Sequence, residues 1–152
     1  MIAWMVGEIE KHRNGSFPQK DYPTDRWEKQ IGTLENKYNV KETEGIISQH
    51  MEMLLIGSHS NSNSIQKIRS AVVILKKFVS ELEQVFVNIL KDAEKQKLNF
   101  PTSSFSLIMW KIEYADQMVE VSEQFLLNSA FGLGISNFTL LLIMIFVDRK
   151  ST

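Results

Sequence analysis

The strongest pattern in the sequence is a run of apolar residues that alternates spacings of three and four along residues 65–93. The members of this stripe are Ile65, Ile68, Val72, Leu75, Val79, Leu82, Phe86, Ile89 and Ala93. A repeat of 3.5 residues, held over about four heptads, is typical of helices that pack side by side in coiled coils and bundles. A flanking series, formed by Ala71, Phe78 and Val85, widens the apolar face and favours a bundle of three or more helices.

A second long helix is expected after Pro101, beginning between Thr102 and Ser104. Its apolar stripe comprises Ile108, Ile112, Ala115, Val119 and Leu126, with Ser122 in one apolar position and a second edge of Trp110, Tyr114, Met118 and Phe125. Because the connection is short, residues 65–124 are predicted to form an antiparallel helical hairpin. The two stripes either share a core within the chain or leave the face from Ile65 to Ile89 open for a partner helix.

Residues 1–57 are predicted to form short amphipathic helices. The apolar positions that support them are Ile2, Met5, Val6 and Ile9, then Trp27, Ile31, Leu34 and Tyr38, then Ile46, Ile47, Met53 and Leu54. Asn39 and Glu42 have the spacing of a capping pair for the last of these helices, and Gly57 is a natural stop. Residues 58–64, rich in Ser and Asn, are expected to form a flexible linker.

The C-terminal part of the chain has no charged residue between Gln124 and Val147. As a helix, residues 125–147 would span about 35 Å, which exceeds a bilayer core of about 30 Å. This predicts a single transmembrane helix, and the alternative is a buried core helix of a soluble bundle. The small residues Ala130, Gly132, Gly134 and Ser136 would let two such helices approach closely, as in a homo-oligomer.

A short polar tail, residues 148–152, follows the apolar segment. A lone apolar helix before a short tail predicts a tail-anchored, single-pass membrane protein whose body lies in the cytosol. Arg149 and Lys150 favour the opposite orientation, with the tail in the cytosol, because basic residues favour the cytosolic side of a membrane. The layout resembles that of tail-anchored coiled-coil proteins such as the SNARE proteins. However, Asn99-Phe100-Pro101 interrupts the heptads well before the apolar segment, so no family is assigned.

Composition removes several classes of chemistry. The formal net charge is −1, and basic residues alternate with acidic ones such as Glu81 and Asp92, which predicts a solvated helix face and no nucleic-acid partner. The chain has no cysteine, so it lacks disulfides, thiolate metal ligands and thiol nucleophiles. The histidines lack metal-ligand spacing, and His50, on an apolar stripe, is expected in the core. An enzyme, a cofactor, a metal or a small-molecule substrate is therefore not expected.

These observations favour a non-enzymatic, membrane-anchored helical adaptor or assembly subunit that binds a protein partner helix or a second copy of itself. One alternative is a membrane-active protein, such as a pore-former, fusion factor or cell-death regulator. Its basis is a polar, small-residue face made of Asn128, Ser129, Gly132, Ser136 and Asn137. The other alternative is a soluble helical bundle in which residues 125–147 are part of the core.

Overall fold

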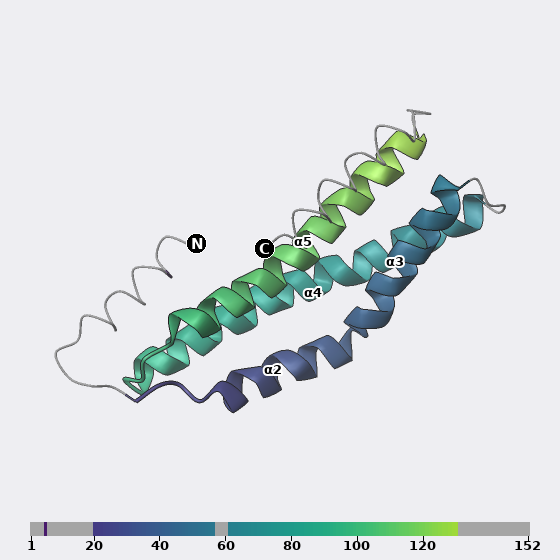
Figure 1. Ribbon diagram of the computed structural model, residues 1–152. Coiled ribbons are helices and arrows are strands. Elements are labelled where there is room, and N and C mark those ends of the chain that lie inside the picture. Colours follow the sequence, from purple (N-terminus) through teal and green to yellow (C-terminus); the bar gives the residue numbers. More distant parts are fainter. Residues whose placement is uncertain (1–4, 6–19, 57–60, 131–152) are drawn as a thin grey trace. The chain divides into compact units, whose positions relative to one another are not determined.

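The computed structural model describes residue 5, residues 20–56 and residues 61–130 of the chain (Figure 1). This part of the protein is all-α, as the periodicity predicted. Its helices are α2 (Thr24–Lys37), α3 (Val40–Leu55), α4 (Asn61–Lys95) and α5 (Thr102–Ala130). Helix α5 begins where the sequence placed it, immediately after Pro101, and α2 also begins directly after a proline, Pro23, because proline fits the start of a helix but not its interior.

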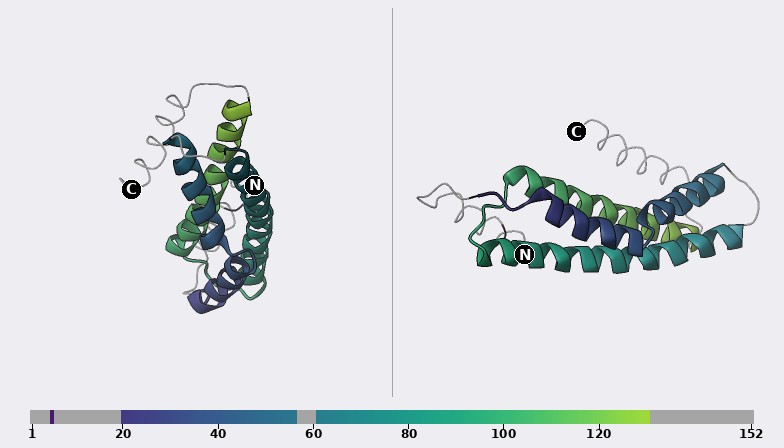
Figure 2. Two further views of the ribbon diagram at one scale, coloured as in Figure 1. Left: turned by 90° about the vertical axis from the view of Figure 1, so that its right-hand side faces the viewer. Right: turned by 90° about the horizontal axis from the view of Figure 1, so that it is seen from below.

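The chain divides into two compact units. Unit 1 comprises Met1–Tyr38 and Phe78–Ala115, and unit 2 comprises Asn39–Lys77 and Asp116–Thr152. Helices α4 and α5 therefore contribute one part to each unit, whereas α2 belongs to unit 1 and α3 to unit 2. The three views in Figures 1 and 2 show α2 beside the later part of α4 and α3 beside its earlier part.

The core of unit 1 is rich in aromatic side chains. Phe86 of α4 is fully buried, and its ring centroid lies 5.2 Å from that of Phe105 and 6.3 Å from that of Phe100. Helix α2 contributes the stripe that the sequence predicted, namely Trp27, Ile31 and Leu34. Within the described residues, the indole nitrogen of Trp27 is the buried side-chain nitrogen that lacks a hydrogen-bond acceptor.

The core of unit 2 is aliphatic and rich in methionine. Its buried side chains come from α3 (Ile47, Met51, Leu54), α4 (Ile68, Ala71, Val72, Leu75) and α5 (Met118, Val119, Val121, Phe125). Two polar groups enter this core as a pair, because the Nδ1 atom of buried His50 lies 3.1 Å from the Oγ atom of buried Ser64. His50 is thus a hydrogen-bonded core residue, as its apolar surroundings in the sequence suggested.

Two helix starts differ from the sequence expectation. Asn39 is the N-cap of α3, but it adopts a left-handed conformation (φ 47°) and its side chain makes no capping hydrogen bond. The predicted capping pair with Glu42 is therefore wrong, because a left-handed Asn directs its side chain away from the first turn. Helix α4 begins at Asn61, inside the segment expected to be linker, and the burial of Ser64 beside His50 gives this first turn a tertiary contact.

The end of α4 forms a Schellman motif. The amide of Leu98 donates to the carbonyl of Ala93 (2.9 Å), and the amide of Lys97 donates to that of Glu94 (3.0 Å). This pattern requires a left-handed residue, and Lys97 adopts φ 56°. Glycine usually occupies this position, because a side chain there crowds the backbone.

We expect Lys97→Gly to stabilise the protein. A non-glycine residue in the left-handed region costs roughly 1–2 kcal/mol, and the greater freedom of glycine in the unfolded chain offsets part of the gain, so about 1 kcal/mol should remain. Urea unfolding of the full chain, followed by circular dichroism, measures this change. Lys97→Ala is the control, because it removes the same charge and keeps the strain. Equal stabilisation by both variants would assign the gain to charge.

Candidate interaction surfaces

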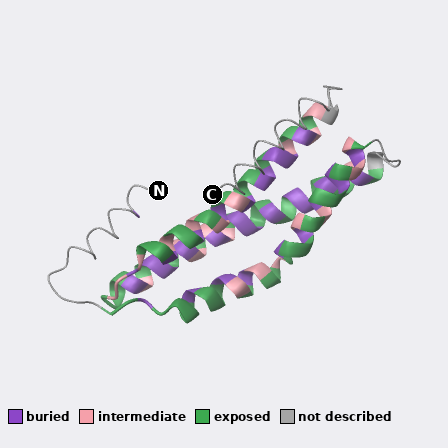
Figure 3. Ribbon diagram, in the orientation of Figure 1, coloured by how far each residue is buried: buried purple, intermediate pink, exposed green. Residues whose placement is uncertain are grey.

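The stripe predicted to receive a partner helix lies inside the chain. Apart from Ile65, which is half-buried, its members are at most 7% exposed, namely Ile68, Val72, Leu75, Val79, Leu82, Phe86 and Ile89. In Figure 3, buried positions (purple) recur along the length of α4. Helices of the same chain cover the stripe within each unit. This burial corresponds to the shared core, one of the two possibilities that the sequence left open, and the binding of a partner stays a prediction.

A first polar cluster joins the start of α2 to α4 within unit 1. The buried Tyr22 hydroxyl donates a hydrogen bond of 2.8 Å to Oδ2 of Asp92, and the Arg26 guanidinium lies 3.6 Å from the same oxygen. The guanidinium also lies over the Tyr22 ring, 5.2 Å from its centroid. The hydrogen bond from Tyr22, followed by those from Gln96 and Arg26, holds the pKa of Asp92 below its ordinary value of 3.8.

A second cluster of the same composition joins the end of α2 to α4, also within unit 1. The Tyr38 hydroxyl donates to Glu81, and Lys37 Nζ donates to the two carboxylate oxygens at 3.2 and 3.1 Å. Lys37 Nζ also lies 5.2 Å from the centroid of the Tyr38 ring. The hydrogen bonds from Tyr38 and then Lys37 hold the pKa of Glu81 below its ordinary value of 4.5.

The sequence interpretation missed these clusters, because it placed Glu81 and Asp92 on a solvated face. Their spacing of eleven residues, close to three turns of one helix, was the available signal. The partners lie 43 and 70 residues away in the sequence, so spacing alone could not identify them. The clusters hold α2 in register on α4, and both tyrosines have raised pKa values, which suits structural hydrogen-bond donors.

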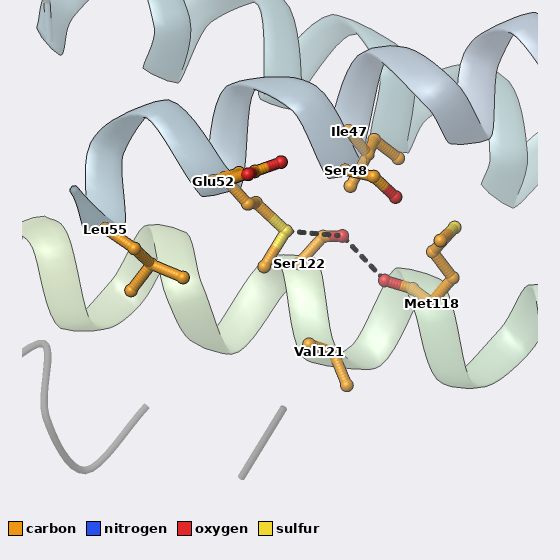
Figure 4. A pocket seen from close by; sticks show the side chains of 8 residues that line it. Ile47, Ser48, Glu52, Leu55, Met118, Val121 and Ser122 are labelled. Atoms are coloured by element: carbon orange, nitrogen blue, oxygen red, sulfur yellow. Dashed lines mark hydrogen bonds between the residues drawn. The ribbon is translucent and has the colours of Figure 1, made fainter. Parts of the chain in front are cut away.

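Unit 2 contains a mainly apolar groove between α3 and α5, drawn in Figure 4. Its volume is about 150 Å³, and its lining is Ile47, Ser48, Met51, Glu52 and Leu55 from α3 with Met118, Val121 and Ser122 from α5. Ser48 and Glu52 are exposed at the rim. Ser122 is fully buried, and its hydroxyl donates a hydrogen bond of 2.6 Å to the carbonyl of Met118. This bond satisfies the hydroxyl at a position that the apolar stripe would otherwise fill.

Unit 1 carries an exposed apolar and aromatic face on α5. Leu107 is 47% exposed and Trp110 is 49% exposed, and they lie one turn apart on the same side of the helix. Tyr114, a further turn along, stacks on Trp110 with ring centroids 5.6 Å apart and an interplanar angle of 27°. Tryptophan and tyrosine are enriched among residues that dominate protein–protein binding energy, so this face is a candidate contact for a partner.

The C-terminal predictions fall mostly outside the described residues. Residues 125–130 continue α5, and Phe125 is 2% exposed in unit 2. Ala130 is the last residue of α5, whereas Gly132, Gly134 and Ser136 lie outside the described part. Among the helices that the structure describes, none is both long and apolar enough to cross a membrane.

A metal site is absent from the described ranges, because they contain no group of three or more His, Asp or Glu side chains arranged to hold an ion. Comparison with known proteins adds no assignment. The chain matches no family model, no curated protein and no solved structure. The two candidate sites of the described part are the groove of unit 2 and the aromatic face of unit 1.

We expect the two polar clusters to make stability depend on pH in the acidic range. Because the pKa values of Asp92 and Glu81 are lowered in the folded protein, their contribution is present above pH 4.5 and is lost as the pH falls below 4.5 and then 3.8. In Asp92→Asn/Glu81→Gln, the loss of unfolding free energy between pH 7 and about pH 3 should be smaller than in the wild type. Glu83→Gln is the control. A similar loss of unfolding free energy in the wild type and both variants would exclude the clusters as the source of the pH dependence.

We also expect Leu82→Asp to unfold unit 1 rather than to release a partner. Leu82 is fully buried, and an unpaired buried charge costs roughly 3–5 kcal/mol, a large part of the stability of a domain. Circular dichroism of the full chain should show a clear loss of helix. Val73→Asp, at a position 48% exposed on the same helix, should keep its helicity. Native helicity in Leu82→Asp would show that the stripe faces solvent.

Proposed function

We propose that the protein is a non-enzymatic helical adaptor or assembly subunit that is attached to a membrane by its C-terminal apolar segment. The single observation that carries the proposal is the uncharged segment 125–147, whose first residues form the end of α5 in a folded helical body. Such a body presents contact surfaces, and the segment would hold those surfaces at a bilayer. The candidate sites described above are all of the contact type, which supports the same class of function.

The partner surface that we propose is the Leu107–Trp110 face of α5. A flat aromatic stack on one rigid helix contributes large apolar contact area at little conformational cost. Exposed Glu113 borders this face on the same helix. The partner that fits this surface is an amphipathic helix with large apolar side chains on its contact face.

The membrane proposal has a geometric consequence for α5. Residues 131–147, which follow α5, would span about 25 Å as a helix, less than the bilayer core of about 30 Å. A helix that crosses the bilayer would therefore draw on the last residues of α5, where Phe125 is buried in unit 2. We infer that unit 2 would lie directly against the membrane surface.

One experiment tests both halves of the proposal. The full chain is expressed in cells with a photo-crosslinking amino acid in place of Leu107, and the membranes are then irradiated, washed at alkaline pH and floated. The wild type should stay in the floated membranes and carry a cross-linked protein. Trp110→Ser should float equally but lose the adduct, whereas Glu113→Ser should retain it.

A second pair of variants tests the anchor itself. Leu140→Asp/Ile143→Asp places two charges in the apolar segment. Insertion of each charge into a bilayer costs about 2.5–3.5 kcal/mol, so this variant should wash off the membrane. Leu140→Val/Ile143→Val keeps the segment apolar and should float. Wild-type protein that washes off would reject the anchor. An adduct that is absent, or that persists in Trp110→Ser, would reject the adaptor surface.

A further inference from the structure

The groove of unit 2 has the size of a socket for side chains rather than of a site for a metabolite. Pockets for small molecules usually measure about 300–1,000 Å³, whereas this groove holds about 150 Å³. A dry apolar cavity of this size accommodates a group as large as one aromatic ring. Three of its lining residues, Ile47 and Met51 on α3 and Val121 on α5, are buried and offer such a group apolar contacts.

The apolar surface of the groove continues toward the end of α5. Figure 4 shows that α3 and α5 run in the same direction, with Ile47 opposite Met118 and Leu55 further along. Ile56, which follows α3, is 73% exposed, and Leu127, near the end of α5, is 49% exposed. A segment that returned from the end of α5 along the groove would therefore meet mainly apolar side chains, with Ser48 and Glu52 at the rim.

The chain itself provides a segment of matching length and chemistry. Residues 138–147 are all apolar except Thr139, and as a helix they measure about 15 Å. The groove residues on α3, from Ile47 to Leu55, extend over about 12 Å of helix. Residues 131–137 connect the two, and Gly132 and Gly134 allow the backbone conformations that a reversal requires.

We propose that, away from a membrane, residues 138–147 fold back and occupy the α3–α5 groove of unit 2. The claim that the segment leaves the groove at a bilayer rests on the proposed membrane attachment. The claim that it occupies the groove does not. The two places exclude each other, because one segment of ten residues cannot lie in the groove and cross a bilayer. Insertion into a membrane therefore opens the groove, and the protein presents this surface only when it is attached.

The absence of cysteine makes a direct test possible, because introduced thiols are the only thiols in the chain. In a fold-back, position 141 lies near Glu52, since the returning segment runs antiparallel to α3 and begins near Leu55. The full chain with Glu52→Cys and Leu141→Cys is translated without membranes and treated with a short bismaleimide. We expect an intramolecular cross-link. The control replaces Gln49, which is exposed on α3 but does not line the groove, in place of Glu52.

The Glu52→Cys pair should react about tenfold more than the Gln49→Cys pair, because a docked segment has a high effective concentration at the groove. Glu52 is exposed, so the substitution leaves the core intact. Equal reaction of both pairs would overturn the proposal, and a cross-linked dimer would assign the groove to the segment of a second copy.

Liposomes added during translation should abolish the cross-link in the molecules that float with them. A cross-link that persists in floated molecules would overturn the exclusive occupation of groove and bilayer. Cross-linking without any flotation would leave the fold-back supported and reject the membrane attachment, so the two failures are distinguishable.

Discussion

The long apolar stripe of α4 is the element on which the other helices depend. Its side chains recur every 3.5 residues, so they stay on one side of the helix from Ile68 to Ala93, and this side is buried in both units. Helix α2 and the start of α5 cover it in unit 1, and α3 and the end of α5 cover it in unit 2. Helices as short as α2 are marginal in isolation, so their stability comes mainly from this contact.

Apolar contact alone leaves the position of a short helix along a long one weakly defined. The clusters around Asp92 and Glu81 define it for α2, since each carboxylate accepts a tyrosine hydroxyl and faces a cation. The exposed ion pairs within them contribute little energy individually. Their geometry nevertheless selects one register. The backbone pairing of Tyr22 with Asn99 (2.7 Å) adds a further restraint at the start of α2.

The C-terminal segment connects the fold to the proposed function. Phe125 is both the first residue of segment 125–147 and a buried residue of unit 2, so under the proposed membrane attachment the bilayer and unit 2 would compete for the end of α5. The same segment could lie in a bilayer or on apolar protein surface, because hydrophobic transfer is non-directional and depends on area rather than on the partner. A helical body with an apolar groove next to such a segment therefore has the components of a surface whose availability depends on attachment.

The sequence by itself determined that the described part is helical and which faces of its helices form the core. The 3.5-residue stripe, Pro101 before α5, and the apolar positions of Trp27, Ile31 and Leu34 are local signals. Local periodicity is sufficient to specify which face of a helix is buried. Periodicity does not specify what covers that face. Only the tertiary structure decided that the stripe packs against the chain's own helices rather than against a partner.

The tertiary structure also decided where the polar contacts form. The Tyr38–Glu81 and His50–Ser64 pairs join residues from different helices, and the left-handed turns at Asn39 and Lys97 serve helix directions that local sequence does not encode. The groove arises in the same way, because a space between α3 and α5 depends on how two separated helices pack. Such features depend on contacts between residues that are distant in the sequence, whereas the apolar periodicity that specifies the helices is a local property of the sequence.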